Sequence, residues 1–114
     1  MQKIVEVENA QKLTTEAIGW SPVLFMGKKK GLEQSHALAN QALDKKFEEV
    51  KVSTFPEAKE AYEASLSTRA EADQLFQKAA KMFKIEFAKE ACKKILESWE
   101  QGLKAIELAE SAKV

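Results

Sequence analysis

Residues 56–102 read PEAKEAYEASLSTRAEADQLFQKAAKMFKIEFAKEACKKILESWEQG. The 45 residues between Pro56 and Gly102 contain neither proline nor glycine, and they are rich in Ala, Glu, Lys, Leu and Phe. These residue types either lose little conformational freedom by becoming helical or fill a core. The composition therefore predicts that this stretch is the long helical part of a small all-α domain.

Two apolar stripes run along this stretch at three- and four-residue spacing. The first consists of Ala58, Ala61, Tyr62, Ser65, Ala72, Phe76, Ala79, Ala80 and Phe83, and the second of Ile85, Ala88, Cys92, Ile95, Leu96, Trp99, Leu103 and Ile106. On one straight helix, at about 100° per residue, the second stripe lies nearly opposite the first. Either the chain turns near Lys84–Phe87 and forms an antiparallel pair, or one continuous helix changes partners and an oligomer covers its second stripe. Both interpretations stay open, because no glycine or proline marks a turn there.

The rest of the chain also favours helices. We expect a single helical domain over residues 1–114, with helices at 4–18, 32–52, 56–83 and 86–111, folded as an antiparallel three- or four-helix bundle. Within residues 3–8, Ile4, Val5 and Val7 alternate with Glu6 and Glu8, so this stretch is either a short strand or the first part of a helix. Thr54 and Glu57 have the spacing of a capping box, with Pro56 inside the first turn, and this boundary predicts that 32–52 and 57–83 are neighbouring antiparallel helices.

The apolar run Val23-Leu24-Phe25-Met26 precedes Gly27, three lysines and Gly31. Ser21 and Pro22, just before it, suit a helix cap and a first helical position. We interpret residues 23–31 as a connector whose apolar side chains close one end of the bundle. The alternative is a docking loop, in which the apolar residues enter a surface and the lysines meet anionic groups.

Charge and length exclude several classes of protein. The 18 basic and 18 acidic residues cancel, so no global field attracts nucleic acid or an anionic membrane. The single cysteine permits no intrachain disulfide and fits a reducing compartment. No apolar run has the length of a signal peptide or of a membrane span. We expect a cytoplasmic protein with no nucleic-acid partner and no membrane span. Weak association of the protein with a membrane surface stays open.

Few residues suggest chemistry. Glu33 and His36 form a Glu-x-x-His pair, which supplies two ligands in di-iron helical bundles, but that site needs two such pairs and further carboxylates. We therefore interpret His36 as a histidine at the edge of the core. Cys92 lies on an apolar stripe and is expected to be a buried thiol. Because no nucleophile motif or phosphate-binding loop is present, we expect no enzyme activity, no metal and no cofactor.

The segment Ile85-Glu86-Phe87-Ala88-Lys89-Glu90-Ala91 resembles phasins, the helical proteins that coat polyhydroxyalkanoate granules. Those proteins often carry a Glu-Phe-Ala-Lys segment within alanine-rich amphipathic helices. The resemblance covers seven residues and the general composition. It implies a non-enzymatic, usually oligomeric coat protein in the cytoplasm.

The leading functional hypothesis is a non-enzymatic helical interaction or scaffold module, which self-associates or binds another protein through an apolar helix face. The alternatives are a phasin-like coat on granules or lipid surfaces, and a small metalloprotein or enzyme around Glu33 and His36. The candidate interface residues are Trp20, Val23, Leu24, Phe25, Met26, Phe76, Phe83, Ile85 and Trp99.

Overall fold

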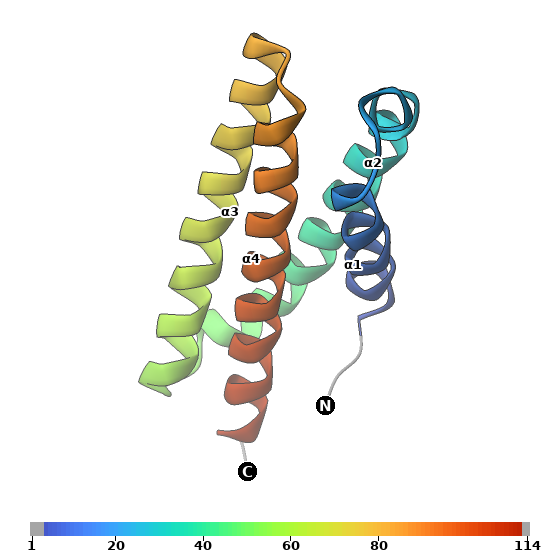
Figure 1. The fold of residues 1–114 in the computed structure, drawn as a ribbon. Coiled ribbons are helices and arrows are strands. Elements are labelled where there is room, and N and C mark those ends of the chain that lie inside the picture. Colours follow the sequence, from blue (N-terminus) through green and yellow to red (C-terminus); the bar gives the residue numbers. More distant parts are fainter. Residues whose placement is uncertain (1–3, 113–114) are drawn as a thin grey trace.

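The computed structural model describes residues 4–112, and within this range all regular structure is helical. The helices are α1 (Val5–Ile18), α2 (Pro22–Lys51), α3 (Pro56–Met82) and α4 (Ile85–Ser111), joined by short turns (Figure 1). This confirms the prediction of an all-α bundle. Residues 5–8 of the ambiguous N-terminal stretch are helical, whereas residue 3 lies outside the described residues. No helix in this range is long and apolar enough to cross a membrane.

The long C-terminal stretch folds back on itself. α3 ends at Phe83, whose φ of 55° and ψ of 37° place it in the left-handed region, and Lys84 is extended before α4 begins. The continuous-helix alternative is therefore wrong. The turn lies at residues 83–84, so it overlaps the predicted turn segment, Lys84–Phe87, only at Lys84. A residue in the left-handed conformation is a common helix terminator, but it is usually glycine.

Small residues face one another within the α3–α4 hairpin. Three buried small residues in each helix recur every seventh position: Ala58, Ser65 and Ala72 in α3, and Ala91, Ser98 and Ala105 in α4. The Ser65 hydroxyl donates to the Ser98 carbonyl oxygen at 2.6 Å, and the Ser98 hydroxyl donates to the Ser65 carbonyl oxygen at 2.7 Å. Such bonds to the backbone of the opposite helix require the two helix axes to lie close together, which small side chains allow.

α4 is buried on a second side by larger residues. Ile95, Trp99 and Ile106 are almost fully buried and belong to the main core cluster, together with residues of α1, α2 and α3. A smaller cluster near the α1–α2 turn contains Trp20 and Phe25. α4 therefore lies between α3 on one side and the α1–α2 pair on the other, which explains why its sequence carries two different apolar faces.

The predicted connector at residues 23–31 is wrong, because α2 begins at Pro22 and continues through both glycines. The start is well specified: the Ser21 hydroxyl accepts a hydrogen bond from the Leu24 N–H at 3.2 Å, and Pro22 occupies the first helical position. Burial of Phe25 and Leu32 helps to offset the cost of the two glycines, about 1 kcal/mol each in a helix.

The expected capping box at the start of α3 does not form. Phe55 is the N-cap and has no side-chain cap hydrogen bond, while its N–H donates to the Ser53 hydroxyl at 3.1 Å. Ser53 thus forms a local side-chain-to-backbone turn before the helix, and the N-cap position falls one residue later than the predicted Thr54.

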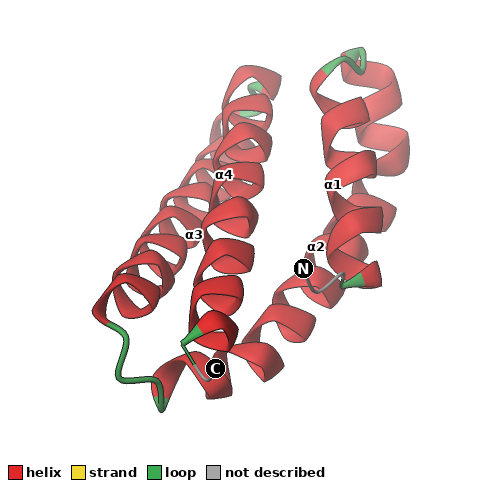
Figure 2. Cartoon of the chain, turned by 90° about the horizontal axis from the view of Figure 1, so that it is seen from below, coloured by secondary structure: helices red, strands yellow, loops and turns green. Residues whose placement is uncertain are grey.

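α2 and α3 are consecutive, yet they contact each other less than any other pair of packed helices, so the prediction that they form a neighbouring antiparallel pair is corrected. α3 packs mainly on α4, and α2 packs on α1 and α4. The two pairs therefore diverge toward the end where the α3–α4 and α1–α2 turns lie (Figures 1 and 2). The molecule measures 49 × 23 × 18 Å, and its radius of gyration of 14.8 Å exceeds the roughly 13 Å of a compact chain of this length.

Candidate functional site

An apolar groove of about 620 Å³ opens where the two helix pairs diverge. One wall is α2, which contributes residues at three- and four-residue spacing from Pro22 to Asn40, and the other is the end of α3 with the start of α4. The principal apolar lining residues are Phe25, Leu32, Phe76, Ala80, Ile85 and Ile95. The groove thus has helical walls, and the hairpin wall extends along about ten residues of α3, or roughly 15 Å.

The α3 side chains that line the groove near the tip are small, namely Ala79 and Ala80. Phe76, one turn further from the tip, reaches the other wall, where its ring centroid lies 5.4 Å from that of His36. The inner end is therefore closed by aromatic contacts, while the outer end is lined by apolar surface that the described residues leave uncovered.

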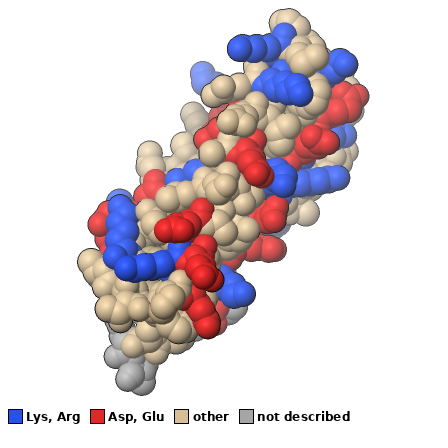
Figure 3. All heavy atoms as spheres, turned by 90° about the vertical axis from the view of Figure 1, so that its left-hand side faces the viewer, with Lys and Arg blue, Asp and Glu red and all other residues tan. Residues whose placement is uncertain are grey.

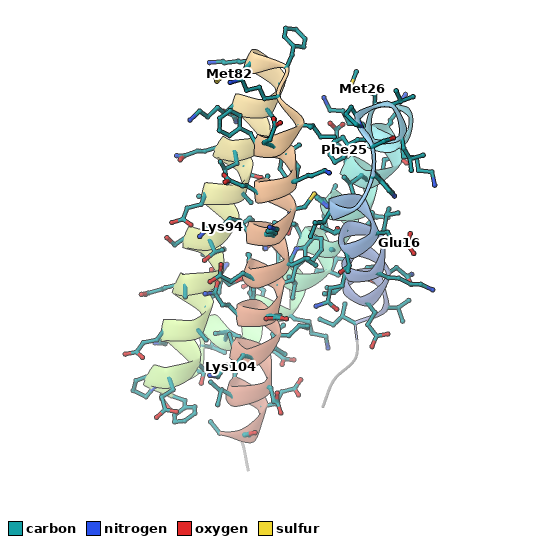
Figure 4. The ribbon with its side chains drawn as sticks, viewed as in Figure 1. Glu16, Phe25, Met26, Met82, Lys94 and Lys104 are labelled. Carbon is teal, nitrogen blue, oxygen red and sulfur yellow. The ribbon has the colours of Figure 1, made fainter. Side chains whose placement is uncertain are left out.

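Large apolar side chains are exposed around the outer end. Phe83 is 92% exposed, Val23 84% and Met26 72%. Figure 4 shows Met82 at the hairpin tip and Met26 at the neighbouring end of α2. Single exposed apolar residues are normal on protein surfaces, whereas a group of them beside an apolar groove is typical of a binding site.

The inner end of the groove is polar but neutral. His36 is almost fully buried, its Nε2 atom lies 2.9 Å from the Thr14 hydroxyl, and its ring also makes an edge contact with Trp99 at 5.2 Å between centroids. Burial lowers the pKa of His36 from 6.5 to about 4, so the ring is uncharged at neutral pH. His36 is therefore a core histidine that holds α1, α2, α3 and α4 together.

Charged side chains at the groove are paired or close to one another. Lys29 and Glu33 lie one turn apart on α2, with 4.0 Å between charged atoms. On α3, partial burial raises the pKa of Asp73, an effect that nearby Arg69 opposes. Arg69 itself donates to Asp44 at 3.0 Å. The groove walls thus carry charges of both signs, but most of the surface that lines the groove is apolar.

The residues that the sequence singled out for chemistry have other partners or are buried. Cys92 is fully buried, and burial raises the pKa of its thiol to about 11, so the thiolate is not available at neutral pH. Glu33 pairs with Lys29 and His36 with Thr14, so the two members of the Glu-x-x-His pair have separate partners. Within residues 4–112, no three histidine, cysteine or acidic side chains are placed to hold a metal ion.

The structure divides the predicted interface residues into three groups. Phe25, Met26, Phe76, Phe83 and Ile85 line the groove, and Val23 and Leu24 are exposed on the first turn of α2. Trp20 and Trp99 are buried within the chain, Trp20 against Phe25 and Trp99 with its indole N–H donating to the Asn40 side-chain oxygen at 2.9 Å. The two tryptophans therefore belong to the core.

The sequence reasoning missed Leu32, Ala37 and Asn40 as groove residues. The signal was present, because the three- and four-residue spacing of α2 extends back from Leu32 through Lys29 and Phe25 to Pro22. The glycines at 27 and 31 concealed the part before Leu32, since they led to the interpretation of residues 23–31 as a connector. Ala37 and Asn40 lie inside the predicted helix 32–52, but one is small and the other polar, so apolar spacing did not single them out.

No protein-family model, no curated protein and no solved structure matches this chain.

Proposed function

We propose that this chain is a non-enzymatic helical interaction module, and that its groove receives the apolar face of a helix from a partner protein. The supporting observation is the open apolar groove between α2 and the α3–α4 hairpin. Its volume is that of a typical binding pocket, about 300–1,000 Å³, and pockets of this kind form between the helices of bundles.

A helix is the occupant that the walls favour. α2 and the hairpin present rows of side chains at helical spacing, and a groove between helices accepts the i, i+3, i+4 and i+7 side chains of an amphipathic helix. A segment of about three turns matches the roughly 15 Å over which the hairpin forms the second wall. The partner is either another protein or a second copy of this chain.

The proposal is tested with a substitution inside the groove and a matched one outside it. Ala37 is exposed and lines the groove on α2, whereas Ala70 is exposed on α3 and does not line it. Both are alanines in helices, so replacement by glutamate changes helix propensity little and equally. Ala37→Glu places a charge on the apolar wall, which a bound apolar helix face would have to desolvate.

The assay measures binding of fluorescent three-turn amphipathic helical peptides, together with scrambled peptides of the same composition, by fluorescence anisotropy. Light scattering in parallel measures self-association. We expect the amphipathic peptides to bind the original chain and the Ala37→Glu chain at least tenfold more weakly, a difference of about 1.4 kcal/mol. Ala70→Glu is expected to behave like the original chain. A strictly monomeric chain that binds neither the peptides nor a hydrophobic dye would refute the proposal.

A further inference from the structure

The two helix turns at the open end carry a charge pattern that the chain as a whole does not. Residues 20–32 and 74–85, which form the ends of α2 and of the α3–α4 hairpin, contain six lysines and no acidic residue, although the chain has 18 basic and 18 acidic residues. Glu33, Asp73 and Glu86 border these segments, and Glu33 pairs with Lys29. Both segments lie at the same end of the molecule (Figure 1). Figure 3 shows basic side chains gathered at the extreme hairpin end and both signs of charge further along the helices.

Exposed apolar side chains lie among these lysines. Val23 and Met26 are on the first turns of α2, before Lys28, and Phe83 is between Lys81 and Lys84. The basic end therefore offers apolar groups and positive charge side by side, on two separate tips.

Phe83 adds an independent observation. It adopts the left-handed conformation, which costs a residue with a bulky side chain about 1–2 kcal/mol relative to glycine, and its side chain is 92% exposed. Neither burial nor backbone geometry within the chain accounts for a phenylalanine at this position. Strain retained at an exposed position is a reason to look for a function of that side chain.

We propose that this end docks onto an anionic membrane surface. Phe83, Val23 and Met26 enter the headgroup region, and the surrounding lysines lie over the anionic lipids. Two signals of this kind, apolar insertion and basic charge, together give stable attachment where either alone is weak. The inference goes beyond the proposed function, because it concerns the tips themselves: Met26 and Phe83 also line the groove, whereas Val23, Lys28 and Lys30 do not.

Two features favour a lipid surface over an acidic protein. Lysine is depleted from protein–protein interfaces, whereas clusters of lysines near apolar side chains are typical of contact with anionic lipids. The tips also belong to different helix pairs with a groove between them, and a deformable surface can contact both without matching their shape.

The test uses the full chain and flotation with vesicles of phosphatidylcholine, with and without phosphatidylserine. Three variants are compared with the original chain. The first replaces Lys28, Lys29 and Lys30 by glutamine, the second is Phe83→Gly, and the third is a matched control that replaces Lys45, Lys59 and Lys104, exposed lysines away from the tips, by glutamine.

We expect binding only to vesicles with phosphatidylserine, and weaker binding as salt increases. Each tip lysine removed is expected to lower partitioning by up to about fivefold. Phe83→Gly is expected to lower it about tenfold or more, through loss of the inserted ring, although the same change relieves the backbone and leaves the chain at least as stable. The control lysine variant and Ala37→Glu are expected to bind like the original chain.

No flotation with phosphatidylserine vesicles would overturn the proposal, as would an equal loss in the tip and control lysine variants. Retention on immobilised polyglutamate that depends on the tip lysines, without vesicle binding, would assign the end to an acidic protein and overturn it too. Unchanged binding of Phe83→Gly would overturn the role of insertion. Because Ala37→Glu disrupts only the groove, failure of this proposal is distinguishable from failure of the proposed function.

Discussion

Alanine in place of each helical glycine is expected to change stability in a direction that depends on the position. Gly27 and Gly31 lie in α2, and a Cβ atom added at either would have no neighbour within 4 Å. At Gly102 in α4, an added Cβ would lie 2.9 Å from Phe47 Cζ and 3.0 Å from the Ser65 hydroxyl oxygen. The helix propensity of alanine favours all three substitutions, so any difference between them reports the local packing.

The expected magnitudes follow from these contacts. At Gly27 and Gly31 the gain in propensity is unopposed, and each substitution should raise the free energy of unfolding by about 0.5–1 kcal/mol. At Gly102 the methyl group meets Phe47, which is 1% exposed. It also meets Ser65, whose hydroxyl is bonded to α4. Overpacking of this kind costs about 1–3 kcal/mol, which offsets the gain and leaves Gly102→Ala neutral to about 2 kcal/mol less stable.

The assay is urea unfolding followed by far-ultraviolet circular dichroism, with the three variants and the original chain measured together. We expect Gly27→Ala to exceed Gly102→Ala by about 1–3 kcal/mol at an unchanged denaturant slope, with melting temperatures several degrees apart. Equal stabilisation at positions 27 and 102 would refute the close approach of α2, α3 and α4 around Gly102. A loss of stability in Gly27→Ala and Gly31→Ala would refute the helical first half of α2.

Four further outcomes are expected. Phe83→Gly should raise the free energy of unfolding by about 1 kcal/mol and Phe83→Ala should not, because only glycine relieves the left-handed backbone; equal urea midpoints for the two variants would contradict this. Burial lowers the pKa of His36 in the folded chain to about 4, against 6.5 for an exposed histidine, so the unfolded chain binds a proton first as pH falls. Stability should drop by about 3 kcal/mol between pH 6.5 and 4, and a His36→Gln chain followed by urea unfolding should lack that part of the slope. Ser65→Ala and Ser98→Ala should each lower the free energy of unfolding by about 1 kcal/mol. Because the two hydroxyls form one reciprocal contact, the two losses should be coupled in a double-mutant cycle, and additive losses would contradict the reciprocal pair. Cys92 should react with a thiol reagent only when the chain unfolds, since burial raises its pKa to about 11, and rapid modification under native conditions would show that the thiol is accessible.

The helices themselves could be predicted from local sequence. Freedom from glycine and proline between Pro56 and Gly102 predicts helix, and the structure contains α3 and α4 there. Ser21 and Pro22 indicate a helix start, and the structure confirms both the cap and the first position. These features depend on backbone conformation and on side chains a few residues apart, so the sequence is sufficient for them.

Part of the candidate site was also visible. Phe76, Phe83 and Ile85 were predicted as interface residues from apolar spacing, and Phe25 and Met26 from the apolar run at residues 23–26. All five line the groove. The first half of α2 was missed, because isolated glycines and a lysine run favour a connector locally. Phe25 and Leu32, on either side of the lysine run, are buried against α1 and α4, and this burial favours a helix. The burial depends on parts of the chain that are distant in sequence.

The sequence by itself determined that this chain is helical and which faces of its helices are apolar. Only the tertiary structure decided what covers each face. The turn at Phe83 has no glycine to mark it, and the hairpin that it closes is held by the contacts of Ser65 and Ser98 and of the small residues around them. The groove beside the hairpin is likewise a tertiary feature, because helix pairing depends on side-chain size and shape at contacts between residues far apart in sequence.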